Sequence, residues 1–242
     1  MIPVWLHALS VGALILGGVC ALIIVADIFN RPQHMAIMNA VWPLVALFAG
    51  PIALWAYFAY GRLAARAMAA VPNGGEPPST RLTPFPVAVG EGTAHCGAGC
   101  TLGDIVAEWL CFAAPAIALA FGWRSVFSEE MFAVWVVDYI FAFSFGIAFQ
   151  YFSIAPMRGL SFWPGLLAAL KADTLSLTAW QFGMYGLMAI ARYGYFHPLL
   201  GKMPAVNTPE FWFTMQIGML TGFLTSYPVN WWLIKIGIKE NM

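Results

Sequence analysis

The sequence predicts an all-α membrane protein, a bundle of about six transmembrane helices with both termini in the cytoplasm. The composition is the first reason: 61% of the 242 residues are hydrophobic and 9% are charged, and the mean hydropathy of +0.77 lies outside the range of soluble domains. The second reason is a series of apolar runs of about 20 residues, the length that crosses the hydrocarbon core. The third is the distribution of basic residues between these runs.

Six apolar runs are long enough to be membrane spans: residues 4–28, 37–60, 102–122, 131–154, 174–195 and 211–234. The first run has no basic segment before it, unlike a signal peptide, so we expect it to remain as a span. The short stretch 161–171, SFWPGLLAALK, is too short to cross. We expect it at the inner interface or at the start of the fifth span.

The basic residues orient these six spans. If the second and fourth connections and the tail are cytoplasmic, the cytoplasmic side holds seven basic residues and the other side four. The seven are at positions 62, 66, 81, 158, 171, 235 and 239, and the four at 31, 124, 192 and 202. Because cytoplasmic loops are enriched in Lys and Arg, this favours both termini inside.

The chain divides into three parts on this interpretation. Residues 1–61 form an N-terminal two-helix hairpin, and residues 101–242 form a four-helix membrane domain. Between them, residues 62–100 are rich in Pro and Gly and are expected to be an irregular cytoplasmic loop that ends in a His-Cys motif. In the reducing cytoplasm the thiols of this motif would stay free.

The His-Cys motif carries the clearest chemical signal. If a helix begins by Cys96, then Cys96, Cys100, Asp104 and Glu108 recur every four residues and line one face. The helix N-terminus and the neighbouring His95 would then lower the pKa of the thiols. Thiolates and an imidazole are soft donors that suit Cu(I), or alternatively Zn(II).

Methionines extend the set of soft donors. Met184 and Met188 are one turn apart in the fifth run, and Met215 and Met219 are one turn apart in the sixth. A short outer connection makes these two runs an antiparallel hairpin, which brings the two Met pairs to matching depths. Paired thioethers are able to pass Cu(I) through hydrocarbon, although methionine also serves as an ordinary gap-filler in helical cores.

Four acidic residues are also candidates for a functional role. Asp104, Glu108, Asp138 and Asp173 lie in or beside the predicted spans. Ionisable groups there are expensive and usually face a cavity or a partner, so these carboxylates are candidates for a proton or ion relay.

Three hypotheses for function remain open. The first is transport or delivery of a soft metal, with copper as the cargo and the ligands His95, Cys96, Cys100, Met184, Met188, Met215 and Met219. The second is a membrane thiol redox protein in which Cys96 and Cys100 cycle with a quinone. The third is a structural or assembly subunit whose Cys and His residues clasp a zinc ion.

Other functional classes find less support. The sequence has no Walker loop, nucleophile elbow or zincin motif, so a hydrolytic or phosphoryl-transfer enzyme is the less favoured interpretation. Eleven basic and eleven acidic residues cancel, which excludes a basic surface for nucleic acid. The expected partners are membrane lipid, the metal ion, and a metallochaperone or membrane-complex partner.

Several stretches resemble a known family. They are AHCGAGCTLGD, FQYFSIAPMRGLS, LKADTLSLTAWQFGMYG and the C-terminal FWFTMQIGMLTGFLTSYPVNWWLIKIGIKENM. Together they are similar to a bacterial polytopic membrane family, domain of unknown function 4396, over roughly the last 150 residues. The resemblance implies a shared multi-span fold that includes the His-Cys block, and a place in the bacterial inner (cytoplasmic) membrane. It implies no activity.

Overall fold

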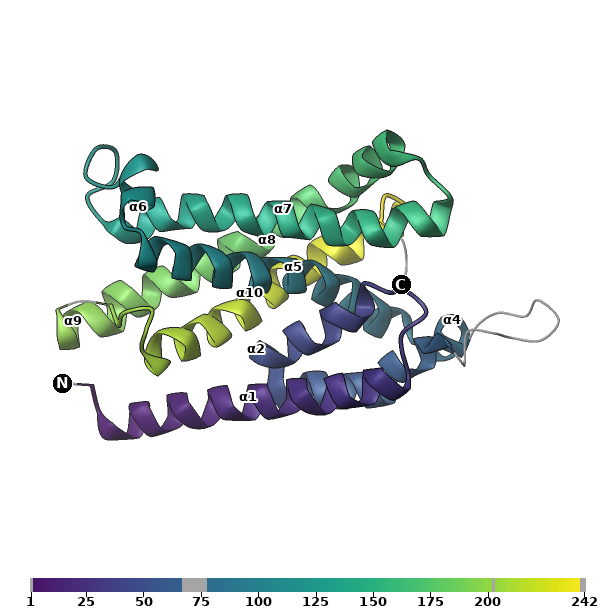
Figure 1. Cartoon of the computed structure of the whole chain (residues 1–242), viewed down its shortest axis with the longest axis horizontal. Helices are drawn as coiled ribbons and strands as arrows, with labels where there is room; N and C mark the ends of the chain where they lie inside the picture. The colour runs from purple at the N-terminus through teal and green to yellow at the C-terminus, as the bar shows by residue number, and fades with distance from the viewer. Residues whose placement is uncertain (1, 67–77, 202, 240–242) are drawn as a thin grey trace.

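The computed structural model describes residues 2–66, 78–201 and 203–239, which form helices and no strand. The long helices are α1 (Val4–Asn30), α2 (Met38–Ala59), α5 (Phe85–Ala113), α7 (Glu130–Arg158), α8 (Phe162–Ile190) and α10 (Pro209–Lys235). The short ones are η1 (Gly61–Ala64), α4 (Pro78–Leu82), α6 (Ala116–Ala120), η3 (Ala191–Phe196) and α9 (His197–Leu200). They build an elongated bundle (Figure 1). Four helices, α1, α2, α5 and α7, are long and apolar enough to cross a membrane.

Helix α2 does not cross the bundle, because it reverses at its centre. Gly50 has φ 50° and ψ −123°, a conformation that L side chains rarely adopt, and Pro51 follows. The rings of Trp42 and Tyr57 lie 5.5 Å apart. In a continuous helix these two residues would be separated by about 22 Å along the axis. Helix α2 is therefore a helical hairpin with its tip at Gly50.

Polar contacts close the base of this hairpin next to the end of α1. The Asp27 carboxylate accepts a hydrogen bond from the Tyr57 hydroxyl at 2.8 Å and another from Arg62 Nε at 2.9 Å. Gln33, just after α1, forms a β-bridge with Ala65, just after η1. Both ends of α2 thus lie at the end of the bundle where α1 finishes.

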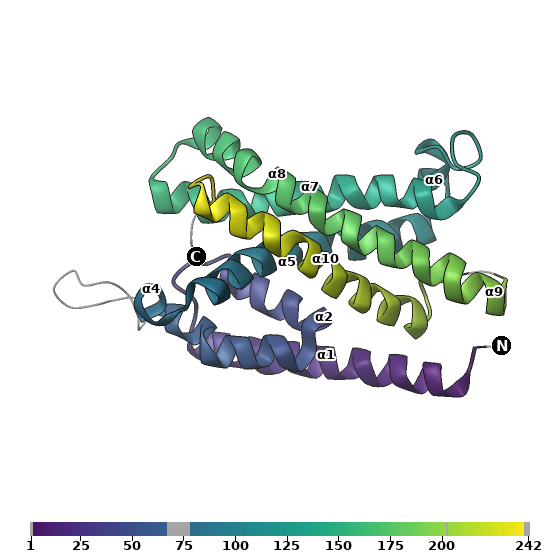
Figure 2. The same ribbon diagram turned by 180° about the vertical axis from the view of Figure 1, so that it is seen from behind.

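The reversal of α2 changes the expected topology. Helices α1, α5, α7, α8 and α10 run along the bundle, whereas α2 enters and leaves at one end (Figures 1 and 2). Helix α1 starts at one end of the bundle and α10 finishes at the other (Figure 1). The predicted six crossings with both termini on one side do not fit this arrangement. Hydropathy measures the length of an apolar run and does not report a change of direction within it.

Helix α5 is the central element and contacts α2, α7, α8 and α10. Its glycines allow the close approach of α7: a Cβ on Gly99 would lie 2.5 Å from the Gly146 Cα, and one on Gly103 would lie 2.3 Å from the Ala142 nitrogen. Small residues are the usual means of packing membrane helices closely.

The start of α5 corrects the predicted loop over residues 62–100. The helix begins at Phe85, directly after Pro84, and ends at Ala113, so the third span lies earlier than the predicted 102–122. The glycines that suggested a loop form the contact surface of a helix. Within the predicted loop, residues 67–77 lie outside the described part of the chain.

Helices α8 and α10 pack as the antiparallel pair that the sequence predicts. A Cβ on Gly218 would lie 3.1 Å from the Met184 Cγ, and one on Gly222 would lie 2.8 Å from the Trp180 Nε1, so both glycines make room for side chains of α8. The stretch 161–171 forms the first turns of α8, one of its two expected places.

Candidate functional site

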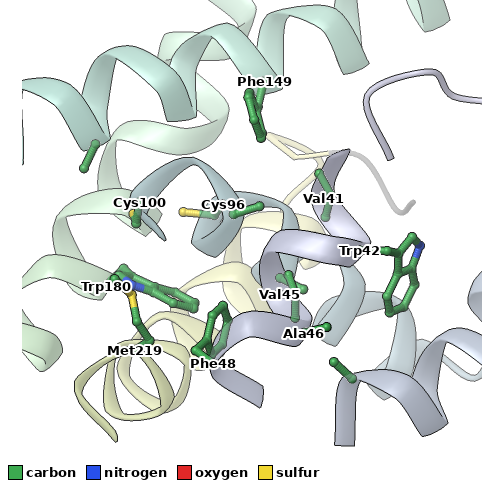
Figure 3. Packing of buried hydrophobic residues seen from close by; sticks show 14 of the residues in the cluster. Val41, Trp42, Val45, Ala46, Phe48, Cys96, Cys100, Phe149, Trp180 and Met219 are labelled. Atoms are coloured by element: carbon green, nitrogen blue, oxygen red, sulfur yellow. The ribbon is translucent and has the colours of Figure 1, made fainter. Parts of the chain in front are cut away.

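The predicted polar face of α5 is confirmed. Cys96, Cys100 and Asp104 have no exposed surface, and Glu108 is 6% exposed. The side chains of Cys96 and Cys100 lie close together, one turn apart on α5 (Figure 3). The expectation that a helix N-terminus activates them is wrong, because α5 begins about three turns before Cys96. Both cysteines are instead in the middle of a helix, among buried side chains.

His95 precedes Cys96 on α5 and contacts α7. Its buried ring lies against Phe149 of α7, with 6.2 Å between ring centroids. Neither ring nitrogen has a hydrogen-bond partner in the described residues. Within residues 2–66, 78–201 and 203–239, no three His, Cys, Asp or Glu side chains are grouped to hold a metal ion. A metal held by the cysteines would therefore have the two thiolates as its only ligands or would also take thioether ligands.

The four predicted methionines are all buried and belong to the same core cluster as the two cysteines. The Thr101 hydroxyl, one residue after Cys100, lies 3.7 Å from the Met219 sulfur. The Trp180 indole lies between Cys100 and Met219 in Figure 3 and packs on the backbone at Gly97. The sulfurs thus converge in the bundle, but Trp180 stands between the cysteines and the methionine.

The predicted methionines line two different cavities. Met215 and Met219 line a cavity of about 160 Å³, together with Thr101 and Gln216. Met188 lines a separate cavity of about 550 Å³ at the end of α5. The sulfurs therefore share one packed core and do not line one continuous channel in this conformation.

The carboxylates continue from the cysteine pair toward the end of α5. Asp104 accepts a hydrogen bond from Gln181 Nε2 of α8 at 3.1 Å. Asp138, fully buried on α7, interacts electrostatically with Glu108 and Asp104. Neither Asp138 oxygen has a partner in the described residues. An ionised carboxylate in such a site is very costly, so this group needs a proton or a cation.

Asp173, the fourth predicted relay residue, has a different environment. It forms an ion pair with Lys239 at 2.6 Å, and both side chains are fully buried. Helix α10 ends at Lys235, and Gly237, with φ 74°, turns the chain back so that Lys239 enters the bundle. The sequence shows both residues, but only the structure reveals that the tail returns.

The tip of the α2 hairpin is a further feature that the sequence analysis missed. In a regular helix the Leu47 carbonyl would accept from residue 51, which is a proline and has no N–H. Instead, Gln216 Nε2 of α10 donates a hydrogen bond to the Leu47 carbonyl oxygen at 2.6 Å. Phe48 lies against Trp180, with 5.8 Å between ring centroids. In the sequence, the Gly50-Pro51 pair within an apolar run is the feature that indicates an interrupted helix.

Comparison with known proteins adds a family to this description. No curated protein and no solved structure matches the chain. The model of one family, described as domain of unknown function (DUF4396), matches residues 87–239, a segment that begins with α5 and ends at Lys239. The chain therefore belongs to the DUF4396 family, as its cysteine motif and C-terminal stretches predict, while α1 and the α2 hairpin lie outside the matched segment.

Proposed function

We propose that the protein moves a soft metal ion, Cu(I), through the membrane. The cysteine and methionine sulfurs would be the ligands, and the buried carboxylates would form the relay for protons or cations. The observation that carries this proposal is the face of α5 on which the thiols of Cys96 and Cys100 continue into Asp104 and Glu108, all within a buried core. Thiols and thioethers prefer soft ions, and unpartnered carboxylates inside a membrane mark ion and proton pathways.

The broken helix α2 supports a transport function. Irregular backbone is tolerated at membrane depth only where protein surrounds it or where it lines a cavity. The hairpin meets this condition, since Leu47 and Phe48 line the small cavity together with Met215 and Met219. Interrupted helices of this kind form substrate and ion sites in many secondary transporters.

The basic residues orient the bundle in this proposal. The end with the hairpin base carries eight of the ten described basic residues: Arg31, Arg62, Arg66, Arg81, Arg158, Lys171, Lys235 and Lys239. The opposite end carries Arg124 and Arg192. The positive-inside rule makes the first end cytoplasmic, with the start of α1 outside and the end of α10 inside a bacterial cytoplasmic membrane.

Metal bound to the purified full chain tests the proposal. We expect the wild type to retain Cu(I), or Ag(I) as its redox-stable substitute, through dialysis. The double variant Cys96→Ser, Cys100→Ser should lose most of it. Cys20→Ser is the matched control, since Cys20 is equally buried but lies on α1. Equal, negligible metal in all three proteins would overturn the proposal.

The thiol redox function is the second candidate, and the proximity of Cys96 and Cys100 favours it. A disulfide between residues four apart on one helix is strained, which would make it readily reducible. A thiol titration across a range of redox potentials separates the two candidates. A reversible disulfide without metal retention would favour the redox function, and metal retention without a disulfide would favour transport.

A further inference from the structure

One cavity of the bundle lies at the end opposite the hairpin base. It has a volume of about 550 Å³ and lies among the end of α5, the start of α7, the end of α8 and the segment before α10. Seven of its 17 lining residues have aromatic or thioether side chains, namely Phe112, Trp123, Met131, Trp135, Met188, Met203 and Phe211. This volume is in the range of small-molecule sites, about 300–1,000 Å³.

One buried carboxylate gives this cavity its charge preference. Glu108 lines it, is 6% exposed, and makes no hydrogen bond or ion pair with any residue in the described segments. Glu129 also lines it but pairs with Arg192, and Glu130 is exposed. The buried wall therefore carries one uncompensated acid, which favours a cation over an anion or a neutral molecule.

The shape of the site favours an organic cation over a metal ion. Across the described segments, no three His, Cys, Asp or Glu side chains gather closely enough to hold a metal, and Glu108, Glu129 and Glu130 are included in that statement. A bare ion would also leave most of the cavity empty. Aromatic walls stabilise ammonium groups, because the negative face of each ring attracts the positive charge.

We propose that this cavity binds an amphipathic organic cation, with its ammonium group against Glu108 and its apolar part against the aromatic wall. The site shares Glu108 and Met188 with the proposed metal path but contains neither Cys96 nor Cys100, so binding of the organic cation is measurable without copper. It gives the protein a ligand site that faces outward in the orientation inferred above.

Titration of the purified full chain with benzyltrimethylammonium tests the site, followed by calorimetry and by tryptophan fluorescence. We expect Glu108→Gln to weaken binding by about tenfold or more, the loss typical of a charged partner. Glu91→Gln is the control, because Glu91 lies on the same helix near its other end and does not line the cavity. Glu108→Gln keeps the size and shape of the side chain but cannot ionise, so the variant should fold.

Two further measurements make the result decisive. Ala205, exposed on the cavity wall, offers a steric block: Ala205→Trp should abolish binding without disturbing the core. The Cys96→Ser, Cys100→Ser variant should bind the probe as the wild type does, whatever its metal content. Equal binding by wild type and Glu108→Gln, or equal binding of the uncharged isostere neopentylbenzene, would overturn the proposal.

Discussion

The buried ion pair between Lys239 and Asp173 provides a quantitative test of the fold. Both side chains are fully buried, and their charged atoms lie 2.6 Å apart. Replacing one partner of such a pair leaves an uncompensated charge and costs about 3–5 kcal/mol. We expect Lys239→Met and Asp173→Leu each to destabilise the protein by this amount. For a chain of this length that corresponds to a fall in Tm of about 6–20 °C.

Thermal unfolding in detergent measures these effects as a double-mutant cycle. The double variant Lys239→Met, Asp173→Leu should recover most of the loss, because it removes both charges together. Lys235→Met is the control: Lys235 is exposed and only overlies the Trp231 ring at 5.3 Å, so its loss should cost about 1 kcal/mol or less. If Lys239→Met is no more harmful than Lys235→Met, the tail does not insert into the bundle.

Three other predictions test the architecture. Gly50→Ala should lower the free energy of unfolding by about 1–3 kcal/mol because residue 50 has a positive φ. Gly12→Ala is the control and should be neutral or stabilising, since Gly12 lies in α1 with open space around it. Equal Tm values for the two variants would argue against the hairpin. Gly103→Ala should lower the Tm through a clash with the α7 backbone, an overpacking cost of about 1–3 kcal/mol, and an unchanged Tm would contradict this contact. All four native cysteines are buried, so they should not react with an impermeant maleimide applied to intact cells. In the inferred orientation the maleimide should label Ser125→Cys, at the outer end, and not Thr80→Cys, at the cytoplasmic end. The reverse pattern would invert the inferred orientation.

Much of the fold follows from the sequence because apolar length and spacing are local properties. The runs at 4–28 and 131–154 correspond to α1 and α7, and the four-residue spacing from Cys96 to Glu108 correctly indicates one helical face. The antiparallel pairing of α8 and α10 follows from their short connection. These features require only helix geometry and the thickness of a bilayer.

The remaining features depend on contacts between distant residues. Gly50 and Pro51 lie inside an apolar run long enough to cross, and only the packing of Trp42 on Tyr57 shows that the chain turns back. The early start of α5 has the same origin, since its glycines are favourable in a helix only when α7 packs against them.

Errors of topology also affected the charge count. With six crossings, Arg31 falls outside and the basic residues divide seven to four. When α2 is a hairpin, Arg31 joins Arg62 and Arg66 at one end, and the described basic residues divide eight to two. The positive-inside rule therefore gives the orientation proposed above when α2 is counted as a hairpin and not as a crossing.

Uptake of Ag(I) into proteoliposomes tests the central claim most directly, namely that the buried acids and sulfurs carry a soft cation through the bundle. Liposomes with the wild type or the Glu91→Gln control should accumulate the ion faster than empty liposomes. Those with Asp138→Asn, which replaces the buried unpartnered carboxyl group with an amide of the same size that cannot ionise, should not exceed the leak. Wild-type uptake equal to that of empty liposomes, or undiminished uptake by Asp138→Asn, would contradict the account.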